Sequence, residues 1–96
     1  MTKTKVVNLR KENYDVYIGR PSIYGNPYRV GIDGTREEVI EMYERYARRN
    51  KEIMQNIPSL VGKKLGCFCK PKRCHGDVLV KLISEFLAEQ RQGEER

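Results

Sequence analysis

The sequence contains no apolar run long enough to cross a membrane. A membrane-spanning helix needs roughly 18 or more consecutive apolar residues, and every apolar run in this chain is much shorter. The first positions, residues 1–5, also lack the apolar core of a secretory signal peptide. We therefore expect a cytoplasmic protein with no membrane partner.

Cysteine and histidine are scarce, with three cysteines and one histidine in 96 residues. An odd number of cysteines argues against a disulfide framework, and the cytoplasm keeps thiols reduced. All four residues nevertheless fall within nine consecutive positions. Structural cysteines rarely cluster in this way, so the stretch 64–77 is the segment around which we expect the chain to be organised.

Internal repeats and linkers are absent as well. A chain of 96 residues is long enough for one core of two or three packed layers. Its 39% of hydrophobic and 33% of charged residues are typical of a globular protein rather than a disordered one. We expect a single α/β domain over residues 1–96, with a frayed tail at about 92–96.

Apolar residues recur at helical spacing in two stretches of the chain. Thr35 and Glu38 have the spacing of a capping box, which marks the start of a helix. The pattern predicts helices over 36–49 and 76–91, and either a short helix or a loop over 51–57.

Three short segments have the apolar or alternating character of strands, namely 5–9, 14–18 and 64–69. The long helical connection from 35 to 63 is compatible with a right-handed crossover between parallel strands. The predicted architecture is therefore a short, mostly parallel sheet with helices packed on it.

The net charge of +6 is concentrated in two segments. Residues 1–32 carry a net +4 and residues 59–77 another +4, whereas the two predicted helical segments are close to neutral. This distribution favours a surface that binds an anion. The alternative is a basic protein that has no anionic partner.

The segment 19–28 has two glycines, two prolines and an Asn-Pro step, so its backbone must be irregular. It is either a plain connection or part of a site. Its polar side chains are suitable donors to a phosphate, a carboxylate or a base edge. These residues are Arg20, Ser22, Tyr24 and Asn26.

One interpretation of the cysteine cluster is a zinc or iron–sulfur site. Cys67, Cys69, Cys74 and His75 would supply three thiolates and an imidazole. The spacing fits such a site poorly, because the adjacent Cys74 and His75 would have to reach one ion. For Cys67, a small buried hydrophobic residue of the last strand is a further interpretation.

The other interpretation is nucleophilic or acid–base catalysis. A cysteine at a helix N-terminus beside Lys72 and Arg73 should have a lowered pKa. We therefore expect Cys74 to be the most reactive thiol and Cys67 the least. His75 would titrate near neutral pH, and Asp77 is a candidate base, nucleophile or orienting group.

Four segments together resemble the DUF4326 family of small uncharacterised phage and prokaryotic proteins, namely 7–10, 17–28, 33–38 and 65–79. The cluster around Cys74 and His75 is also similar, over fewer than twenty residues, to the end of the DUF488 family. That second resemblance implies a Rossmann-like α/β fold. Neither resemblance implies an established reaction.

Three functions follow from these observations. The first is an enzyme that acts on a nucleotide- or nucleoside-like anion by glycosidic-bond or group-transfer chemistry. The second is a zinc- or iron–sulfur-dependent protein. The third is a non-enzymatic module that binds nucleic acid or a host protein through its basic surface.

The expected site of the enzyme has two groups of residues. The catalytic candidates are Cys69, Cys74, His75 and Asp77. The substrate-binding candidates are Asn8, Arg10, Gly19, Arg20, Ser22, Tyr24, Asn26 and Arg73.

Overall fold

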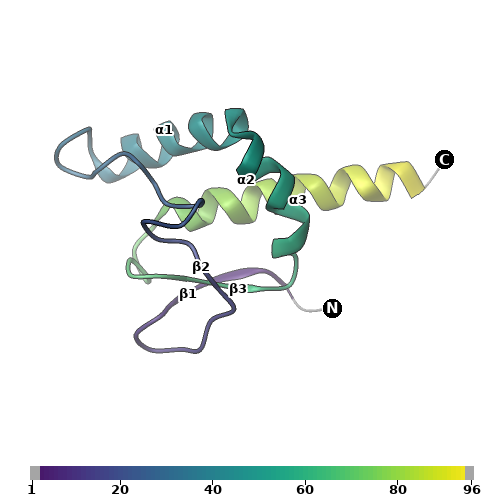
Figure 1. Ribbon diagram of the computed structural model, residues 1–96, viewed down its shortest axis with the longest axis horizontal. Coiled ribbons are helices and arrows are strands. Elements are labelled where there is room, and N and C mark those ends of the chain that lie inside the picture. Colours follow the sequence, from purple (N-terminus) through teal and green to yellow (C-terminus); the bar gives the residue numbers. More distant parts are fainter. Residues whose placement is uncertain (1–2, 95–96) are drawn as a thin grey trace.

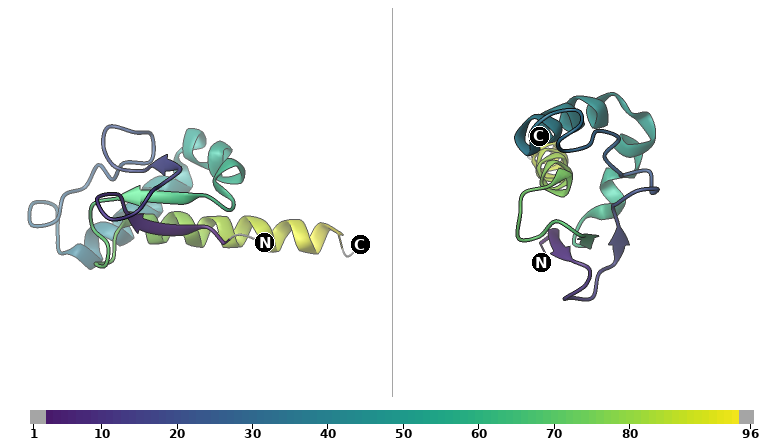
Figure 2. Two further views of the ribbon diagram at one scale, coloured as in Figure 1. Left: turned by 90° about the horizontal axis from the view of Figure 1, so that it is seen from below. Right: turned by 90° about the vertical axis from the view of Figure 1, so that its left-hand side faces the viewer.

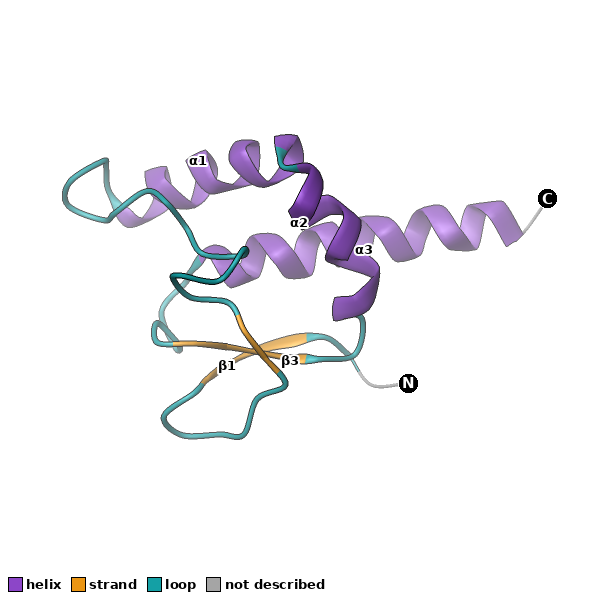
Figure 3. Cartoon of the chain, viewed as in Figure 1, coloured by secondary structure: helices purple, strands orange, loops and turns teal. Residues whose placement is uncertain are grey.

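A computed structural model of the chain describes residues 3–94 (Figure 1). Strands and helices are connected by long loops before α1 and between β3 and α3 (Figure 3). In chain order the elements are β1 (Lys5–Asn8), β2 (Val16–Tyr17), α1 (Arg36–Arg49), α2 (Lys51–Asn56), the 3-10 helix η1 (Ile57–Leu60), β3 (Lys64–Cys67) and α3 (His75–Glu94).

The sheet has three strands in the order β1-β3-β2, and both pairs are parallel. Leu65 of the central strand lies level with Val6 on one side and with Val16 on the other. This confirms the predicted α/β fold with a short parallel sheet. The helices lie on one side of the sheet, so the domain has two layers (Figure 1 and Figure 2).

Helix α1 begins where the capping box predicts. The Thr35 hydroxyl accepts the Glu38 N–H at 3.2 Å, and the Glu38 carboxylate accepts the Thr35 N–H at 2.9 Å. Behind this cap, Val39 and Tyr43 are buried against the rest of the domain. Because the cap fixes the first turn, it also fixes the position of Arg36.

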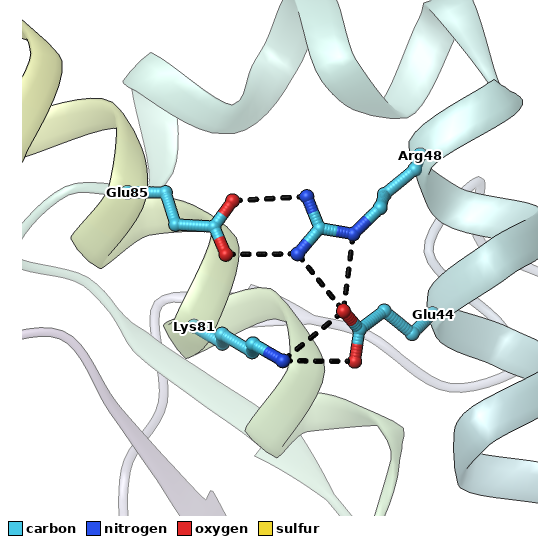
Figure 4. Close-up of polar contacts among 4 residues, drawn as sticks. All are labelled: Glu44, Arg48, Lys81 and Glu85. Atoms are coloured by element: carbon cyan, nitrogen blue, oxygen red, sulfur yellow. Dashed lines mark hydrogen bonds and ion pairs between the residues drawn. The ribbon is translucent and has the colours of Figure 1, made fainter.

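Four charged side chains connect α1 to α3 (Figure 4). The Arg48 guanidinium is 2.8 Å from the carboxylates of Glu44 and Glu85, and the Lys81 ammonium is 3.1 Å from Glu44. Hydrogen bonds from Arg48 lower the pKa of both carboxyl groups. Exposed pairs of this kind contribute at most about 1 kcal/mol each, so apolar packing must supply most of the attachment between these helices.

The first turn of helix α3 packs tightly against the strands. A Cβ atom added to Gly76 would lie 2.8 Å from side-chain carbons of Val6 and Ile18. Further along the helix, Leu79 and Leu82 are buried, as their spacing predicts. The close approach at Gly76 brings the start of α3 against the ends of the strands.

The strands are shorter than the sequence predicts. β1 stops at Asn8, β2 has only two residues and β3 stops at Cys67. The ladder ends with hydrogen bonds from Leu9 N–H to the Cys67 carbonyl at 3.0 Å and from Ile18 N–H to the Gly66 carbonyl at 3.1 Å. After these bonds, residues 68–74 leave the sheet to reach α3.

Helix α3 is longer than predicted, since it begins at His75 and continues to Glu94. Residues 92–94, which were expected to fray, are therefore helical, and the remaining residues 95–96 of that predicted tail lie outside the described part. Gln92 and Glu94 are good helix formers, but Gly93 between them is a poor one, so helix propensity alone does not explain the extension. No helix within residues 3–94 has the length and apolar character needed to span a bilayer.

Candidate functional site

A cavity of about 630 Å³ lies at the carboxyl end of the sheet. Tyr17 and Cys67, the last residues of β2 and β3, are in its wall. The rest of the wall comes from the loop after β2, the first turns of α1, the loop after β3 and the start of α3. Parallel sheets commonly bind their ligands at this end, so the position is consistent with a site.

Cys74 is the residue immediately before α3. Its sulfur accepts the Gly76 N–H at 3.3 Å, and the Asp77 carboxylate accepts the Cys74 N–H at 3.1 Å. Cys74 thus lies just before the first helical turn, as predicted. Asp77 caps the helix and is absent from the residues that line the described cavity, so its position gives its predicted catalytic role no support.

The sulfur atoms of Cys67 and Cys74 are 3.4 Å apart and share a hydrogen bond. This bond and the N–H groups of Lys70 and Cys69 lower the pKa of Cys67. The same bond and burial raise the pKa of Cys74. Cys74 is also 3% exposed, so the expectation that it is the most reactive thiol must be revised.

Cys69 differs from this buried pair. It is partly exposed and lines the cavity. It lies beyond the end of β3, in the loop that leads to α3. Cys69 is therefore the thiol that a molecule in the cavity reaches most easily.

His75 is buried at the inner side of the cavity. Its Nε2 lies 2.6 Å from the carbonyl oxygen of Ile18, and because that oxygen can only accept, Nε2 carries the proton. Burial lowers the pKa of His75, and the nearby Arg20 lowers it further. The ring is therefore neutral at pH 7, with the lone pair on Nδ1.

The loop 19–28 lies beside the start of α3, as predicted. Gly19, Arg20 and Asn26 line the same cavity as His75. The Asn26 side chain also stabilises the loop, because its oxygen accepts the Tyr28 N–H at 2.9 Å. Three of the predicted substrate-binding residues thus line the same cavity as three of the four catalytic candidates, namely Cys69, Cys74 and His75.

Two predicted substrate-binding residues at the end of β1 have other contacts. The Asn8 amide donates to the Lys70 carbonyl at 2.8 Å and so supports the loop after β3. The Arg10 guanidinium lies 5.0 Å from the centre of the Phe68 ring, a distance typical of a cation–π contact. Neither residue lines the described cavity.

The remaining predicted substrate-binding residues also lie outside the described cavity wall. The Ser22 hydroxyl donates to the Gly19 carbonyl at 2.6 Å, and Tyr24 is buried in the core. Arg73 forms an ion pair with Glu37. These three side chains therefore shape or attach the loops around the cavity.

Comparison with known proteins places the chain in a family. A family model described as Domain of unknown function (DUF4326) matches residues 2–85. The chain belongs to the DUF4326 family. It is also 40% identical over 96 residues to the Uncharacterized 12.4 kDa protein in nrdA-td intergenic region of Enterobacteria phage T4, with 95% of this chain and 87% of that protein covered. No solved structure matches the chain.

Two further arginines of this DUF4326 protein, which were not predicted from the sequence as site residues, belong to the cavity wall. Arg29 and Arg36 line the cavity together with Arg20. None of the three forms an ion pair with a side chain described within residues 3–90, and the cavity residues identified there include no carboxylate. The Arg36 guanidinium donates a hydrogen bond to the Arg73 carbonyl at 3.0 Å, which leaves its charge uncompensated. The capping box predicted that Arg36 is the first residue of α1. Arg29 belongs to no motif, so nothing in the sequence indicated its position.

Aromatic side chains form another part of the wall. Tyr17 and Phe68 meet edge to face with ring centres 6.3 Å apart, and Tyr28 also lines the cavity. These rings can pack against a flat apolar group such as a nucleobase. The DUF4326 cavity thus combines cations, aromatic surface and a neutral histidine.

The four candidate metal ligands of the sequence analysis all line the cavity. They are Cys67, Cys69, Cys74 and His75. As placed, they do not form a ligand set, because no group of three or more Cys, His, Asp or Glu side chains in the part that the structure describes has metal-binding geometry. The His75 Nε2 is directed at the Ile18 carbonyl, and the Cys67 and Cys74 sulfurs bond each other.

Proposed function

We propose that the cavity at the carboxyl end of the sheet binds a nucleotide-like anion. The observation that carries this proposal is the set of three arginines, Arg20, Arg29 and Arg36, in a wall without a carboxylate partner. Unpaired cations repel one another, and an anion between them removes that repulsion. Arginine also matches the geometry of phosphate oxygens.

The size and the rest of the wall support the same class of ligand. A volume of about 630 Å³ is within the range of small-molecule sites, roughly 300–1,000 Å³. Tyr17, Tyr28 and Phe68 supply apolar surface for a base.

His75 gives the cavity a group that can accept a proton. Its Nε2–H is held by the Ile18 carbonyl, so Nδ1 would take the proton from an attacking water or hydroxyl group. The attack would form a new bond at the sugar or phosphoryl centre, and the leaving group would depart with the bonding electrons. The proposed activity is therefore glycosidic-bond or group-transfer chemistry on a nucleotide-like substrate.

Calorimetric titration with a panel of nucleoside monophosphates tests the binding part. Arg20→Ala should weaken binding at least about tenfold, because a charge-assisted contact to phosphate contributes more than about 1.4 kcal/mol. The control is Lys63→Ala, which removes an exposed cation just before the start of β3, at the opposite end of the sheet. Equal affinities of the Arg20 and Lys63 variants would contradict the proposal.

Chromatographic analysis of the incubated nucleotides tests the chemical part. His75→Asn should abolish product formation while leaving the dissociation constant within about threefold of the parent, since the charge that holds the anion remains. Product formed at the parent rate by His75→Asn would exclude His75 as the proton acceptor. If the parent protein binds the nucleotides but forms no product, the proposed binding site stands and the proposed enzymatic activity is wrong.

A further inference from the structure

A second concave surface lies on the flank of α1. It has a volume of about 440 Å³ and is lined by Tyr28, Met42, Arg45, Tyr46, Arg49 and Asn50. We refer to it as the α1 groove. Tyr28 lines both the α1 groove and the cavity at the sheet, so the two surfaces adjoin at this side chain.

The α1 groove is positively charged, as the cavity is. Arg45 and Arg49 are exposed and lie one helical turn apart, about 6 Å along the axis. Neither forms an ion pair with any acidic side chain described within residues 3–90. By contrast, Arg48 on the same helix faces α3 and is neutralised there by Glu44 and Glu85 (Figure 4).

Like charges at this spacing on a helix repel each other. The lining of the α1 groove contains no carboxylate that would offset the repulsion. A chain of phosphates would do so, because it places successive negative charges along such a surface. The charge of the α1 groove is therefore suited to a polyanion.

Aromatic rings accompany these cations. Tyr28 and Tyr46 meet edge to face with ring centres 6.3 Å apart at the α1 groove. Proteins that hold single-stranded nucleic acid combine a basic groove with aromatic rings on which bases stack. The α1 groove has both features, whereas a small inorganic anion would require only the arginines.

We propose that the cavity and the α1 groove together bind a single-stranded nucleic acid. This inference rests on the proposed function and specifies its substrate as a nucleotide within a strand. One nucleotide would enter the cavity, and the adjacent phosphates would pass Tyr28 and contact Arg45 and Arg49. A base can enter such a cavity only when it is unpaired, which selects single strands over duplexes.

Fluorescence anisotropy with labelled oligodeoxythymidylates, from the dinucleotide to about 12 nucleotides, tests the inference. The affinity should rise with strand length, and the double variant Arg45→Ala/Arg49→Ala should bind the longer strands at least about tenfold more weakly than the parent. The slope of log affinity against log salt should fall by about 1.4, because single strands contribute about 0.7 per phosphate contact. Lys63→Ala should change both quantities less than the Arg45/Arg49 pair.

The same variants separate this inference from the proposed function. Arg45→Ala/Arg49→Ala should bind nucleoside monophosphates as the parent does, because both side chains lie outside the cavity wall. If monophosphates bind but longer strands bind no more tightly, the inference is wrong and the proposed function stands. The other outcome is that strands bind through Arg45 and Arg49 while monophosphates do not bind and Arg20→Ala leaves the affinity for strands unchanged. In that case the proposed function is wrong, and so is the inference that the cavity and the α1 groove form one site.

Discussion

The three cysteines are close in sequence, yet each has a different environment. Cys67 and Cys74 are buried and share a hydrogen bond, while Cys69 lies in the loop between them and lines the cavity. The helix N-terminus does favour a thiolate at Cys74. Burial and the neighbouring sulfur oppose that effect and raise the pKa of Cys74.

Limited alkylation should therefore modify Cys69 first in the native protein at neutral pH. Cys67 has the lowered pKa, but it is 2% exposed, and Cys74 is both buried and protonated, so both should react more slowly. Mass-spectrometric mapping after brief treatment with iodoacetamide measures the order. Cys69→Ser should lose most of the early label, whereas early labelling of Cys74 would show that this residue is not packed as described.

His75 should make the protein less stable below about pH 6.5. Burial lowers its pKa in the folded state below the ordinary 6.5, so the unfolded chain binds the proton first. Stability should therefore be constant above the unfolded pKa and fall as the pH drops through 6.5 towards the folded value. Urea unfolding of the parent and of His75→Asn between about pH 7 and pH 5 measures this, and equal slopes in the two proteins would contradict it.

At the scale of the elements, the first turn of α3 is the junction between the helix and the strands. Gly76 contacts Val6 and Ile18 so closely that no Cβ atom fits without movement. The same turn holds His75 against the end of β2 through the Ile18 carbonyl. The close packing at Gly76 is therefore what positions the histidine in the cavity.

Gly76→Ala should destabilise the fold by about 1–3 kcal/mol because of overpacking. Helix propensity alone would predict that Gly76→Ala raises the free energy of unfolding, since alanine stabilises a helix by up to about 1 kcal/mol relative to glycine. Urea unfolding monitored by circular dichroism measures the difference. Ser84→Ala, at an exposed position of α3, is the control and should be nearly neutral; a stabilised Gly76→Ala would show that the turn is loosely packed.

The helices were more predictable than the strands for a physical reason. A capping box and a repeated apolar face are local signals, and Thr35 with Glu38 located the start of α1 correctly. Strand length depends on where the partners stop, and β2 has only two residues because its pairing with β3 ends there. The capping box placed Arg36 in the first turn of α1, but only tertiary packing brings that turn and Arg29 to the cavity, and no local pattern of the sequence records this packing.

At the scale of the whole molecule, the two positively charged segments of the sequence meet at one end of the sheet. The loop after β2 supplies Arg20 and Arg29, the end of β3 supplies Cys67, and the loop after β3 supplies Cys69 and Cys74. The third arginine of the cavity, Arg36, comes from the nearly neutral helical segment, so segment charge alone did not identify it. The segment 59–77 contributes no lysine or arginine to the cavity wall, so its net charge of +4 lies outside the described cavity.

The purified protein should hold less than one zinc or iron ion per chain. Cys67, Cys69, Cys74 and His75 surround the cavity, but the His75 Nε2 and the two buried sulfurs already have protein partners. Elemental analysis by mass spectrometry measures the content. About one tightly bound ion per chain, lost in Cys69→Ser, would contradict this and would support the metal-dependent alternative.

The central claim is that the cavity at the carboxyl end of the sheet is the binding site for a nucleotide-like anion. The most direct measurement is a nuclear magnetic resonance titration of the labelled protein with adenosine monophosphate. Backbone amide signals of Gly19, Asn26, Cys69 and His75 should shift together and saturate, while those of the turn 61–63 at the other end of the sheet should not move. Shifts scattered over the surface, or confined to residues outside the cavity, would contradict the claim.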